Sequence, residues 1–369
     1  MKTVILVLAA FRAFGQGLPM PGPGTPAPAV RGGGGGGTCT PVSGYAHCRV
    51  LTIDHTQVGA TLMNFPVLVS TTLGSFRIQS SNCYDVVFTS DSGGTAKIPW
   101  EQETCVGSTG AIVDWVGVSS ISGGADTYIY VSYDNASIST AQNTGPLAPA
   151  NVWDTPYKSV WHLGNGASLQ LTDSTSNGNT LTNVGSVAAT AGQVGGAASL
   201  SGSNHLDGSN IASIGGATQF SLSFWVNPTA TPNYAVLMQE WPSAFYLEAI
   251  SGGTGLSFGF SGGQAYETAG SLAVGTWAHY AVVYDGTVPS VTLYRNGVAV
   301  PLTFSGAIPS SLGTSGAPFL IAALDGARLT AALDEVEVST GIARSAAWVA
   351  AQYANQKTSS TFLTIGSEI

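Results

Sequence analysis

Hydrophobic and polar positions alternate over short runs in the first third of the chain, which is the pattern of β-strands buried on one face. Turn-forming residues separate these runs, for example at Ser92-Gly93-Gly94 and Ser122-Gly123-Gly124. The runs cover residues 49–53, 65–70, 85–90, 112–118 and 127–133. The pattern predicts a first β-domain over residues 38–137.

A second series of strand-like runs follows residues 138–152, a looser segment with Pro146 and Pro149 that is typical of a linker. The runs cover residues 220–226, 245–250, 256–260, 277–284, 291–295, 319–322 and 333–339. Only residues 345–356 have a helical pattern, with Trp348, Ala351 and Tyr353 able to share one face. We therefore expect a second β-domain over residues 153–356 and a C-terminal tail over residues 357–369.

The composition favours an all-β chain and excludes several classes of protein. There are 48 glycines, which suits many turns, and 8% of the residues are charged, against about a quarter in an ordinary soluble protein. So little charge excludes a coiled coil and a charge-rich disordered chain. The 11 Lys and Arg residues and the net charge of −9 exclude the basic surface that nucleic-acid binding requires.

The first residues have the pattern of an export signal. Lys2 precedes an apolar run, residues 3–11, and the small residues Ala13 and Gly15 offer a cleavage site. We expect a signal peptide over residues 1–16 and a Pro/Gly-rich spacer over residues 17–37. No other run reaches the length of a membrane span. The protein is therefore expected to be secreted or associated with the cell envelope.

Four cysteines, Cys39, Cys48, Cys83 and Cys105, fit an oxidising compartment. Three pairings are open. Short loops favour Cys39 with Cys48 and Cys83 with Cys105, but the sequence does not fix the connectivity. A metal site is the weaker interpretation, because the chain has no C-x-x-C motif.

Six segments of the second domain, in their order along the chain, resemble the LamG-like, concanavalin-type jelly roll of bacterial secreted proteins. They are residues 160–163 (VWHL), 173–179 (DSTSNGN), 220–226 (FSLSFWV), 277–286 (WAHYAVVYDG), 293–297 (LYRNG) and 333–336 (LDEV). The resemblance implies a β-sandwich of two stacked sheets. It also implies that the closing segment, residues 343–353, lies back against the sandwich.

The first domain resembles a bacterial domain family of unassigned function that commonly stands directly before such jelly rolls. The matching segments are residues 64–69 (NFPVLV), 85–89 (DVVFT), 99–101 (PWE), 113–118 (VDWVGV) and 128–135 (YIYVSYDN). The two cysteine pairs depart from that family. This resemblance implies a second β-sandwich but no chemistry, so the expected fold is all-β with two β-sandwich domains.

Paired carboxylates are the strongest candidates for catalysis, because the concanavalin-type sandwich also hosts glycoside hydrolases. Residues two apart on a strand share a face, so Glu335 and Glu337, or Glu101 and Glu103, are expected to point the same way. The hydrolases carry an alternating Glu-x-Asp-x-Glu triplet, whereas Leu333 stands at the first place here. A structural role for these acids is therefore the favoured interpretation. The chain has none of the common nucleophile, P-loop or H-E-x-x-H motifs.

Two other groups of residues invite a metal interpretation. His162 and His279 lie within apolar strand motifs, where a packed, hydrogen-bonded imidazole is expected rather than a metal ligand. Asp173, Thr175 and Asn177 imitate the alternating oxygen ligands of a calcium loop, and an Asn/Gly turn explains the same residues. A structural Ca²⁺ is the ion that these residues suggest, and we expect no required cofactor.

Aromatic side chains outside the strand motifs offer a sugar-binding site, because sugar rings stack on flat side chains beside hydrogen-bonding groups. The candidates are Tyr234, Glu240, Trp241 and Tyr266, with Gln239 and Tyr246 in the same segment and Glu267 in a neighbouring loop. Trp161, Trp225 and Trp277 belong to strand motifs and are expected in the core.

The sequence therefore predicts an exported, non-catalytic recognition or adhesion protein. Its expected partner is a glycan or an extracellular protein surface, bound through the jelly-roll domain. Two alternatives remain. One is a polysaccharide hydrolase or lyase that uses Glu335 with Glu337 or Glu101, and the other is a structural spacer without a ligand site.

Overall fold

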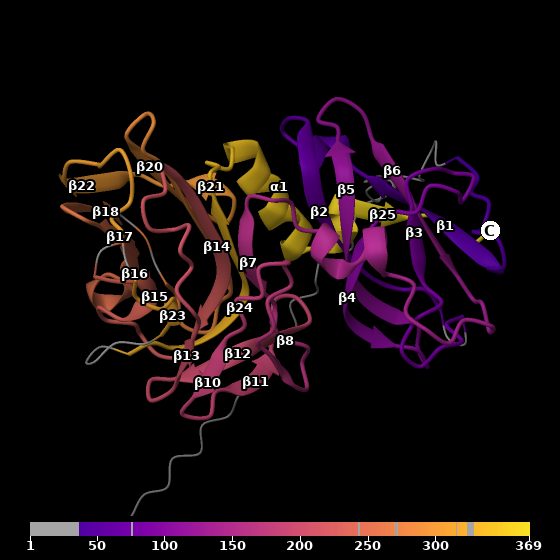
Figure 1. Ribbon diagram of the computed structural model, residues 1–369, viewed down its shortest axis with the longest axis horizontal. Coiled ribbons are helices and arrows are strands. Elements are labelled where there is room, and N and C mark those ends of the chain that lie inside the picture. The colour runs from indigo at the N-terminus through magenta and orange to yellow at the C-terminus, as the bar shows by residue number, and fades with distance from the viewer. Residues whose placement is uncertain are drawn as a thin grey trace, which may run out of the picture. The chain divides into compact units, whose positions relative to one another are not determined.

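The computed structural model describes residues 37–74, 77–242, 244–268, 270, 272–314, 316–322 and 328–369. These residues belong to one compact unit. The predicted signal peptide and all of the spacer except Gly37 lie outside the described residues. Antiparallel sheets dominate the described part of the chain, and the all-β prediction is confirmed (Figure 1).

The first sandwich consists of a four-stranded and a three-stranded sheet. The four-stranded sheet contains, in spatial order, β25 (Leu363–Ile365), β1 (His47–Ile53), β6 (Thr127–Tyr133) and β3 (Val87–Thr89). The three-stranded sheet contains β2 (Leu62–Thr72), β5 (Ala111–Ile121) and β4 (Trp100–Val106). Leu51 and Val131 of the first sheet and Val67 and Trp115 of the second share one buried core.

Two disulfides, Cys39–Cys48 and Cys83–Cys105, stabilise this sandwich. They are the pairing that short loops favour. Cys48 lies on β1, whereas Cys105 ties β4 to the loop that contains Cys83. Both disulfides close short loops, so each restricts only a short segment of the unfolded chain.

The second sandwich consists of two larger sheets that stand face to face (Figure 1). The ten-stranded sheet contains, in spatial order, β21 (Val298–Ala299), β20 (Ser290–Arg295), β19 (Ala278–Asp285), β14 (Gln219–Pro228), β24 (Thr330–Thr340), β12 (Gly196–Ser201), β8 (Leu163–Gly164) and β9 (Leu169–Gln170), with β11 (Ala188–Ala191) paired to β12 and β7 (Tyr157–Trp161) paired to β24. The eight-stranded sheet contains β10 (Thr182–Val184), β13 (His205–Asp207), β23 (Leu320–Ile321), β15 (Val236–Glu240), β16 (Phe245–Ala249), β17 (Leu256–Phe260), β18 (Gly263–Glu267) and β22 (Leu302–Gly306).

Aromatic side chains fill the space between these two sheets. Phe220 of β14 lies against Phe245 and Phe258 of the eight-stranded sheet, with ring centroids 5.1 and 6.2 Å apart. Trp161 is fully buried against Phe319. Trp225 is also buried, as expected, whereas Trp277 is only partly buried.

The helical segments are short apart from α1 (Ala346–Lys357). The others are η1 (His55–Gln57), η2 (Gly145–Leu147), η3 (Pro149–Asn151), η4 (Ser251–Gly253) and α2 (Ser359–Phe362). The side chain of Ser345 caps α1 by accepting a hydrogen bond from the backbone N–H of Trp348. The Gln352 amide donates to Ser223 Oγ, and the Trp225 indole donates to Gln356, so this segment lies against the ten-stranded sheet as the resemblance implied.

The C-terminal residues differ from the expected tail. After α2 the chain forms β25, which pairs with β1 at the edge of the first sandwich. Phe362 and Leu363 are buried there. Their apolar side chains lose contact with water only by packing into the first sandwich, so the chain returns to the domain in which it began.

Helix α1 contacts both sandwiches, and its Asn355 hydrogen-bonds to the first. The Asn355 side chain accepts a hydrogen bond from the Leu68 N–H at 2.7 Å and donates to the Leu68 carbonyl at 3.0 Å. It therefore satisfies the backbone of β2 as a neighbouring strand would. Among the described residues, no helix has the length and apolar character needed to cross a membrane.

Candidate functional site

The outer face of the eight-stranded sheet carries a patch of aromatic and polar side chains. Two rows of paired residues run across its strands. The buried residues Leu247, Phe258 and Ala265 lie between these two rows and face the core. The first row is Gln239, Tyr246, Gly259, Gln264 and Ser305, and the second is Glu248, Ser257, Tyr266 and Thr303. We call Trp241, Tyr246, Glu248, Gln264 and Tyr266 the outer-sheet patch.

Trp241 and Tyr246 form the aromatic part of this patch. Trp241 is 41% exposed and meets the Tyr246 ring edge-on, at 5.1 Å between centroids and an interplanar angle of 83°. Tyr246 lies across Gly259, where any Cβ would overlap its ring. The glycine therefore lets the tyrosine lie flat on the sheet. An exposed indole supported by a fixed ring suits stacking on a flat ligand.

Hydrogen-bonding groups surround these rings. Gln264 Oε1 accepts from the Tyr246 hydroxyl at 2.9 Å and from the Ser257 hydroxyl at 3.3 Å, so its amide nitrogen is turned away from both. Burial raises the pKa of Glu248, and burial followed by the Glu248 carboxylate raises the pKa of Tyr246. The patch thus combines amide, carboxyl and hydroxyl groups with an aromatic surface.

The other sugar-binding candidates lie elsewhere. Tyr234 is 54% exposed but precedes β15, at the end of that strand opposite to Trp241. Glu240 is fully buried, accepts hydrogen bonds from the Ile211 N–H and the Asn210 amide, and is not available to a ligand. Glu267 lies on β18 rather than in a loop, and it is buried. The pairing of β15 with β16 shifts by one residue between Val236 and Met238. This bulge turns the Glu240 side chain toward the core.

A second cluster lies where β4 of the first sandwich meets β24 of the second. Glu101 and Glu103 come from β4, His162 lies between β7 and β8, and Glu335 comes from β24. His162 Nδ1 is 2.9 Å from Glu335 Oε2 and 3.9 Å from Glu103 Oε2, whereas its Nε2 is 3.5 Å from Glu101 Oε2. We call these four residues the junction cluster.

Indole and hydroxyl groups hold the cluster in place. The Trp153 indole donates to Glu101 Oε2 at 2.7 Å, and the Ser174 hydroxyl donates to Glu101 Oε1 at 2.6 Å. The Trp115 indole donates to Glu103 Oε2 at 3.0 Å and its ring stacks on His162, with centroids 5.5 Å apart. As expected, His162 is packed and hydrogen-bonded.

Burial perturbs the acid–base properties of the cluster. It raises the pKa of Glu103 to about 7 and of Glu335 to about 8, although the charge of His162 opposes both shifts. For His162, burial lowers the pKa, but the Glu335 and Glu101 carboxylates overcome it and hold the pKa well above the usual value. Burial also raises the pKa of the neighbouring Asp114 and Asp334. Such perturbed groups are frequent at functional sites.

The acids proposed for catalysis do not form an open pair. Glu335 and Glu337 are 1% and 3% exposed, and Glu337 accepts a hydrogen bond from the Gln356 amide beneath α1. Residue pairing with β14 shifts between Asp334 and Glu337, and Glu335 has a φ of 50°. Because of this bulge, strict alternation does not apply to Glu335 and Glu337.

A cleft of about 450 Å³ opens beside the junction cluster. Among the described residues, Glu101, Glu103 and His162 line it, together with the loop from Thr172 to Thr175, whereas Glu335 and Glu337 do not. A sugar in this cleft would therefore meet Glu101 but not the other two catalytic candidates.

The loop proposed for calcium is closed by its own hydrogen bonds. Asp173 Oδ1 accepts from the Val160 and Thr175 N–H groups, and its Oδ2 accepts from the Thr175 hydroxyl and the Asn179 N–H. The Asn177 amide donates to Thr175 Oγ1 and to a backbone carbonyl. A calcium ion would have to displace these donors.

A calcium titration tests whether this loop binds the ion. Because the Asp173 carboxylate is already saturated by donors, we expect millimolar Ca²⁺ to leave the melting temperature of the metal-free protein unchanged. Differential scanning fluorimetry measures this. A rise with Ca²⁺ in the parent protein that is absent in Asp173→Asn would establish the ion instead.

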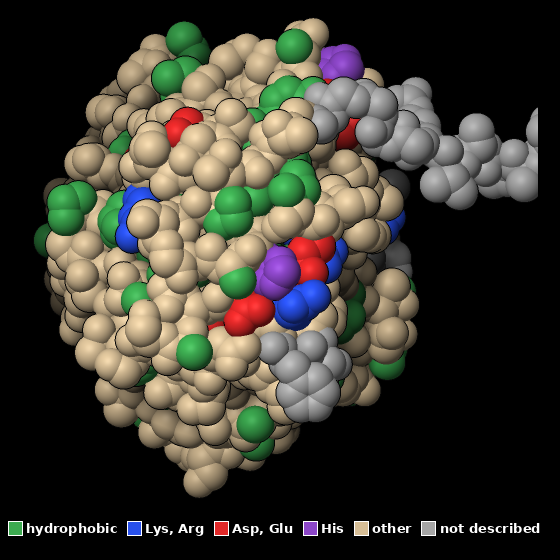
Figure 2. Space-filling model, turned by 90° about the vertical axis from the view of Figure 1, so that its right-hand side faces the viewer, with side chains coloured by type: hydrophobic (Ala, Val, Ile, Leu, Met, Phe, Trp, Pro, Cys, Tyr) green, Lys and Arg blue, Asp and Glu red, His purple; other side chains and the backbone are tan. Residues whose placement is uncertain are grey.

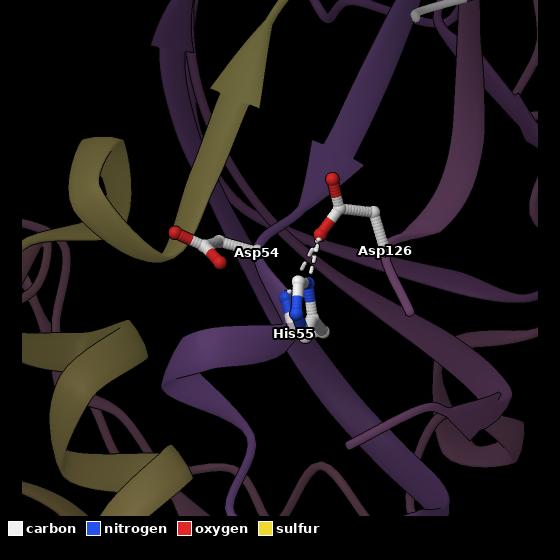
Figure 3. Close-up of side chains that lie close together, drawn as sticks. All are labelled: Asp54, His55 and Asp126. Atoms are coloured by element: carbon white, nitrogen blue, oxygen red, sulfur yellow. Dashed lines mark hydrogen bonds and ion pairs between the residues drawn. The ribbon is translucent and has the colours of Figure 1, made fainter. Parts of the chain in front are cut away.

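Two further charged clusters lie on the first sandwich. Figure 3 shows the Asp126 carboxylate against the His55 ring, with Asp54 on the other side; the His55 Nδ1 to Asp126 Oδ1 distance is 2.6 Å, and Asp54 caps η1. Figure 2 shows acidic, basic and histidine side chains gathered on one face. In this sandwich, ion pairs connect Arg49, Arg77, His47, Asp134 and Glu368. In both clusters the charged side chains pair with one another, so we assign them a structural role.

Comparison with known families identifies the second sandwich. Residues 200–350 match the family model described as the concanavalin A-like lectin/glucanases superfamily. The matched residues lie within the second sandwich, so its fold is concanavalin A-like, as the six sequence segments predicted. A search of curated proteins found no match to the chain.

Three solved structures are similar to part of the chain. Domain 4 of AbnA, an extracellular GH43 arabinanase from Geobacillus stearothermophilus solved in complex with arabinotriose, is 23% identical over 53% of this chain and 96% of that chain, with a TM-score of 0.43. The binding domain of Paraclostridial Mosquitocidal Protein 1 is 15% identical over 54% of this chain and 52% of that one, with a TM-score of 0.43. A structure of botulinum neurotoxin type C, whose cell entry is dependent upon interaction with two ganglioside molecules, is 11% identical over 55% of this chain and 52% of that one, with a TM-score of 0.43.

Proposed function

We propose that this protein binds a carbohydrate chain on the outer-sheet patch of its second sandwich and does not cleave it. The observation that carries the proposal is the exposed Trp241 indole, held edge-on over Tyr246 beside Gln264. The apolar face of a sugar ring stacks on such an indole, while amide and carboxyl groups bind its hydroxyls. The match to the concanavalin A-like lectin/glucanases superfamily supports the same class of ligand.

The dimensions of the patch favour an oligosaccharide over a single sugar. Tyr246 and Tyr266 lie two strands and two residues apart, which corresponds to roughly 11–12 Å at ordinary strand spacings. More than one sugar unit is needed to contact both of these rings.

The arrangement of the acids supports binding without cleavage. A retaining glycosidase needs two carboxyl groups about 5–5.5 Å apart on either side of an open subsite. Glu335 and Glu337 are enclosed by His162 and α1, away from the outer-sheet patch. The second candidate function, a hydrolase that uses Glu335 with Glu337 or Glu101, predicts release of reducing ends and its loss in Glu335→Gln.

Replacing Trp241 with alanine is the sharpest test. We expect retention on a glycan array to fall about 5- to 30-fold, which corresponds to about 1–2 kcal/mol for the loss of one stacked indole. The melting temperature should not change, because the indole is 41% exposed. Tyr246→Ala should weaken binding as well.

The matched control is Phe304→Ala. Phe304 is 46% exposed on the same sheet but pairs with the inward-facing Ala265, so it lies on the opposite face from Trp241. The proposal requires this variant to bind like the parent. Equal retention by Trp241→Ala and the parent contradicts the assigned patch, and a protein that retains no glycan at all supports the structural-spacer alternative.

The cellular location belongs to the same proposal. Two disulfides fit an extracellular protein. We place the protein outside the cell or on its envelope, exported by the predicted signal peptide, where a surface glycan or an extracellular protein is its partner.

A further inference from the structure

The junction cluster presents a set of metal ligands that the proposed glycan binding does not use. One ligand atom from each of Glu103, His162 and Glu335 lies within 4.8 Å of the other two. These residues come from β4, from the turn between β7 and β8, and from β24, so the ligand set exists only when the two sandwiches are in contact. We propose that Glu103, His162 and Glu335 bind one divalent cation of the zinc type.

The distances suit such an ion. Zinc ligands lie about 2.0–2.2 Å from the metal, which places two ligand atoms of a tetrahedral site about 3.3 Å apart. His162 Nδ1 is 2.9 Å from Glu335 Oε2 and 3.9 Å from Glu103 Oε2, so small side-chain movements bring all three to that spacing. An imidazole nitrogen combined with carboxylate oxygens favours zinc over calcium or magnesium, which prefer oxygen alone.

An unpartnered buried oxygen provides an independent indication of a ligand. Glu103 Oε1 has no hydrogen-bond partner among the described residues. The Glu103 side chain is only 2% exposed. Gly195 packs directly on the Glu103 carboxylate, where a Cβ would overlap it. A buried carboxylate oxygen without a donor is unfavourable, and a cation beside Glu103 supplies the missing interaction.

Glu101, the remaining carboxylate beside His162, lies where a second-sphere carboxylate of a metal site would lie. When a histidine binds a metal through one ring nitrogen, its other N–H commonly donates to a carboxylate that orients the ring. His162 Nε2 faces Glu101, and Glu101 is itself held by Trp153 and Ser174. Glu101 is therefore a positioning residue for the metal, not one of its ligands.

The cleft provides the path for the ion and a place for further ligands. Glu103 and His162 line the cleft of about 450 Å³, so water or an exogenous group can complete the coordination. In the bound state the cation links β4 of the first sandwich to β24 of the second.

The test uses the full chain with its disulfides intact, freed of metal with a chelator that is then removed, and Zn²⁺ alone as the probe. We expect one equivalent of zinc to remain bound after gel filtration, measured by mass spectrometry of the metal. X-ray absorption should show nitrogen or oxygen ligands at about 2.0–2.1 Å together with the outer-shell scattering of a single imidazole. Mg²⁺ and Ca²⁺ should not compete.

Variants separate this site from zinc bound at surface histidines. His162→Gln and Glu103→Gln should lose the stoichiometric zinc, and Glu101→Gln should weaken its affinity 10- to 100-fold. Glu240→Gln, a buried acid remote from the cluster, is the control and should bind zinc like the parent. Should His162→Gln fail to fold, Glu103→Gln and Glu101→Gln decide the matter. A parent that retains no zinc, or variants that retain all of it, overturn the proposal without affecting the glycan patch.

Discussion

Replacing Phe362 with alanine is expected to lower the free energy of unfolding by about 3–5 kcal/mol, the usual cost of removing a fully buried phenylalanine ring. Phe362 is 0% exposed and stacks on Phe65 of β2, with ring centroids 6.1 Å apart. Its carbonyl also accepts a hydrogen bond from the Asp54 N–H. The substitution leaves a cavity where the C-terminal segment enters the first sandwich.

The control for this prediction is the adjacent Thr361→Ala. Thr361 is exposed, and its hydroxyl donates only to the Thr358 carbonyl within the same turn. An exposed substitution of this kind changes stability by about 0.5 kcal/mol or less. Urea unfolding followed by tryptophan fluorescence gives the free energy of unfolding of the parent, Phe362→Ala and Thr361→Ala. If Phe362→Ala costs no more than Thr361→Ala, the C-terminal segment is not part of the first sandwich.

The second large effect concerns acid stability and His279. This histidine of β19 is 0% exposed, lies 5.2 Å from the Trp225 ring, and has no hydrogen-bond partner for either ring nitrogen among the described residues. It is therefore packed, as expected, but not hydrogen-bonded. Burial lowers its pKa to about 3, against about 6.5 in an unfolded chain.

The sign of the effect follows from proton binding. Between pH 6.5 and 3 the unfolded chain takes up a proton that the folded chain does not, so the stability contribution of His279 is present above pH 6.5 and is lost as the pH falls. At pH 4.5, two units below the unfolded pKa, this amounts to about 2.7 kcal/mol. His279→Phe keeps an aromatic ring at this position and removes the titration.

The parent should therefore lose about 2–3 kcal/mol more of its free energy of unfolding than His279→Phe loses when the pH is lowered from 7.5 to 4.5. Urea unfolding of both proteins at the two pH values gives this difference. Acids with raised pKa values, such as Glu240, act in both proteins and cancel. Parallel pH profiles for His279→Phe and the parent would contradict the prediction.

Alternation and the jelly-roll resemblance were sufficient to predict much of the fold. Residues 220–226 lie within β14, and residues 277–284 coincide with β19 except that Trp277 precedes the strand; the two strands pair with each other in the ten-stranded sheet. Residues 49–53 and 127–133 correspond to β1 and β6. β1 and β6 have buried positions interspersed with partly exposed ones, as one buried face requires, whereas β14 and β19 are buried along nearly their whole length.

Bulges limited what could be predicted for single side chains. One extra residue in β15 turns Glu240 into the interior, and the bulge in β24 removes the simple relation between Glu335 and Glu337. A bulge leaves no clear trace in a short sequence. Trp241, Tyr246 and Tyr266 of the outer-sheet patch were candidates from the sequence, whereas Glu248 and Gln264 were not, and the alternation did not predict which side chains share a face.

The junction cluster and β25 depend on contacts between distant parts of the chain. His162 is expected to be packed from its local sequence, yet its carboxylate neighbours are far away at Glu103 and Glu335. No spacing rule connects these positions. The signal for β25 was the short apolar run that contains Phe362, Leu363 and Ile365, which follows a helix and is too brief to distinguish a strand from a tail.

The indole N–H resonances provide the most direct test of glycan binding at the outer-sheet patch. A glycan retained by the array is titrated into nitrogen-15-labelled protein, and the tryptophan signals are assigned with single Trp→Phe variants. We expect the Trp241 signal to shift, while those of Trp115 and Trp153 beside the junction cluster stay in place. Shifts confined to Trp115 and Trp153 would place the ligand in the cleft and contradict the account.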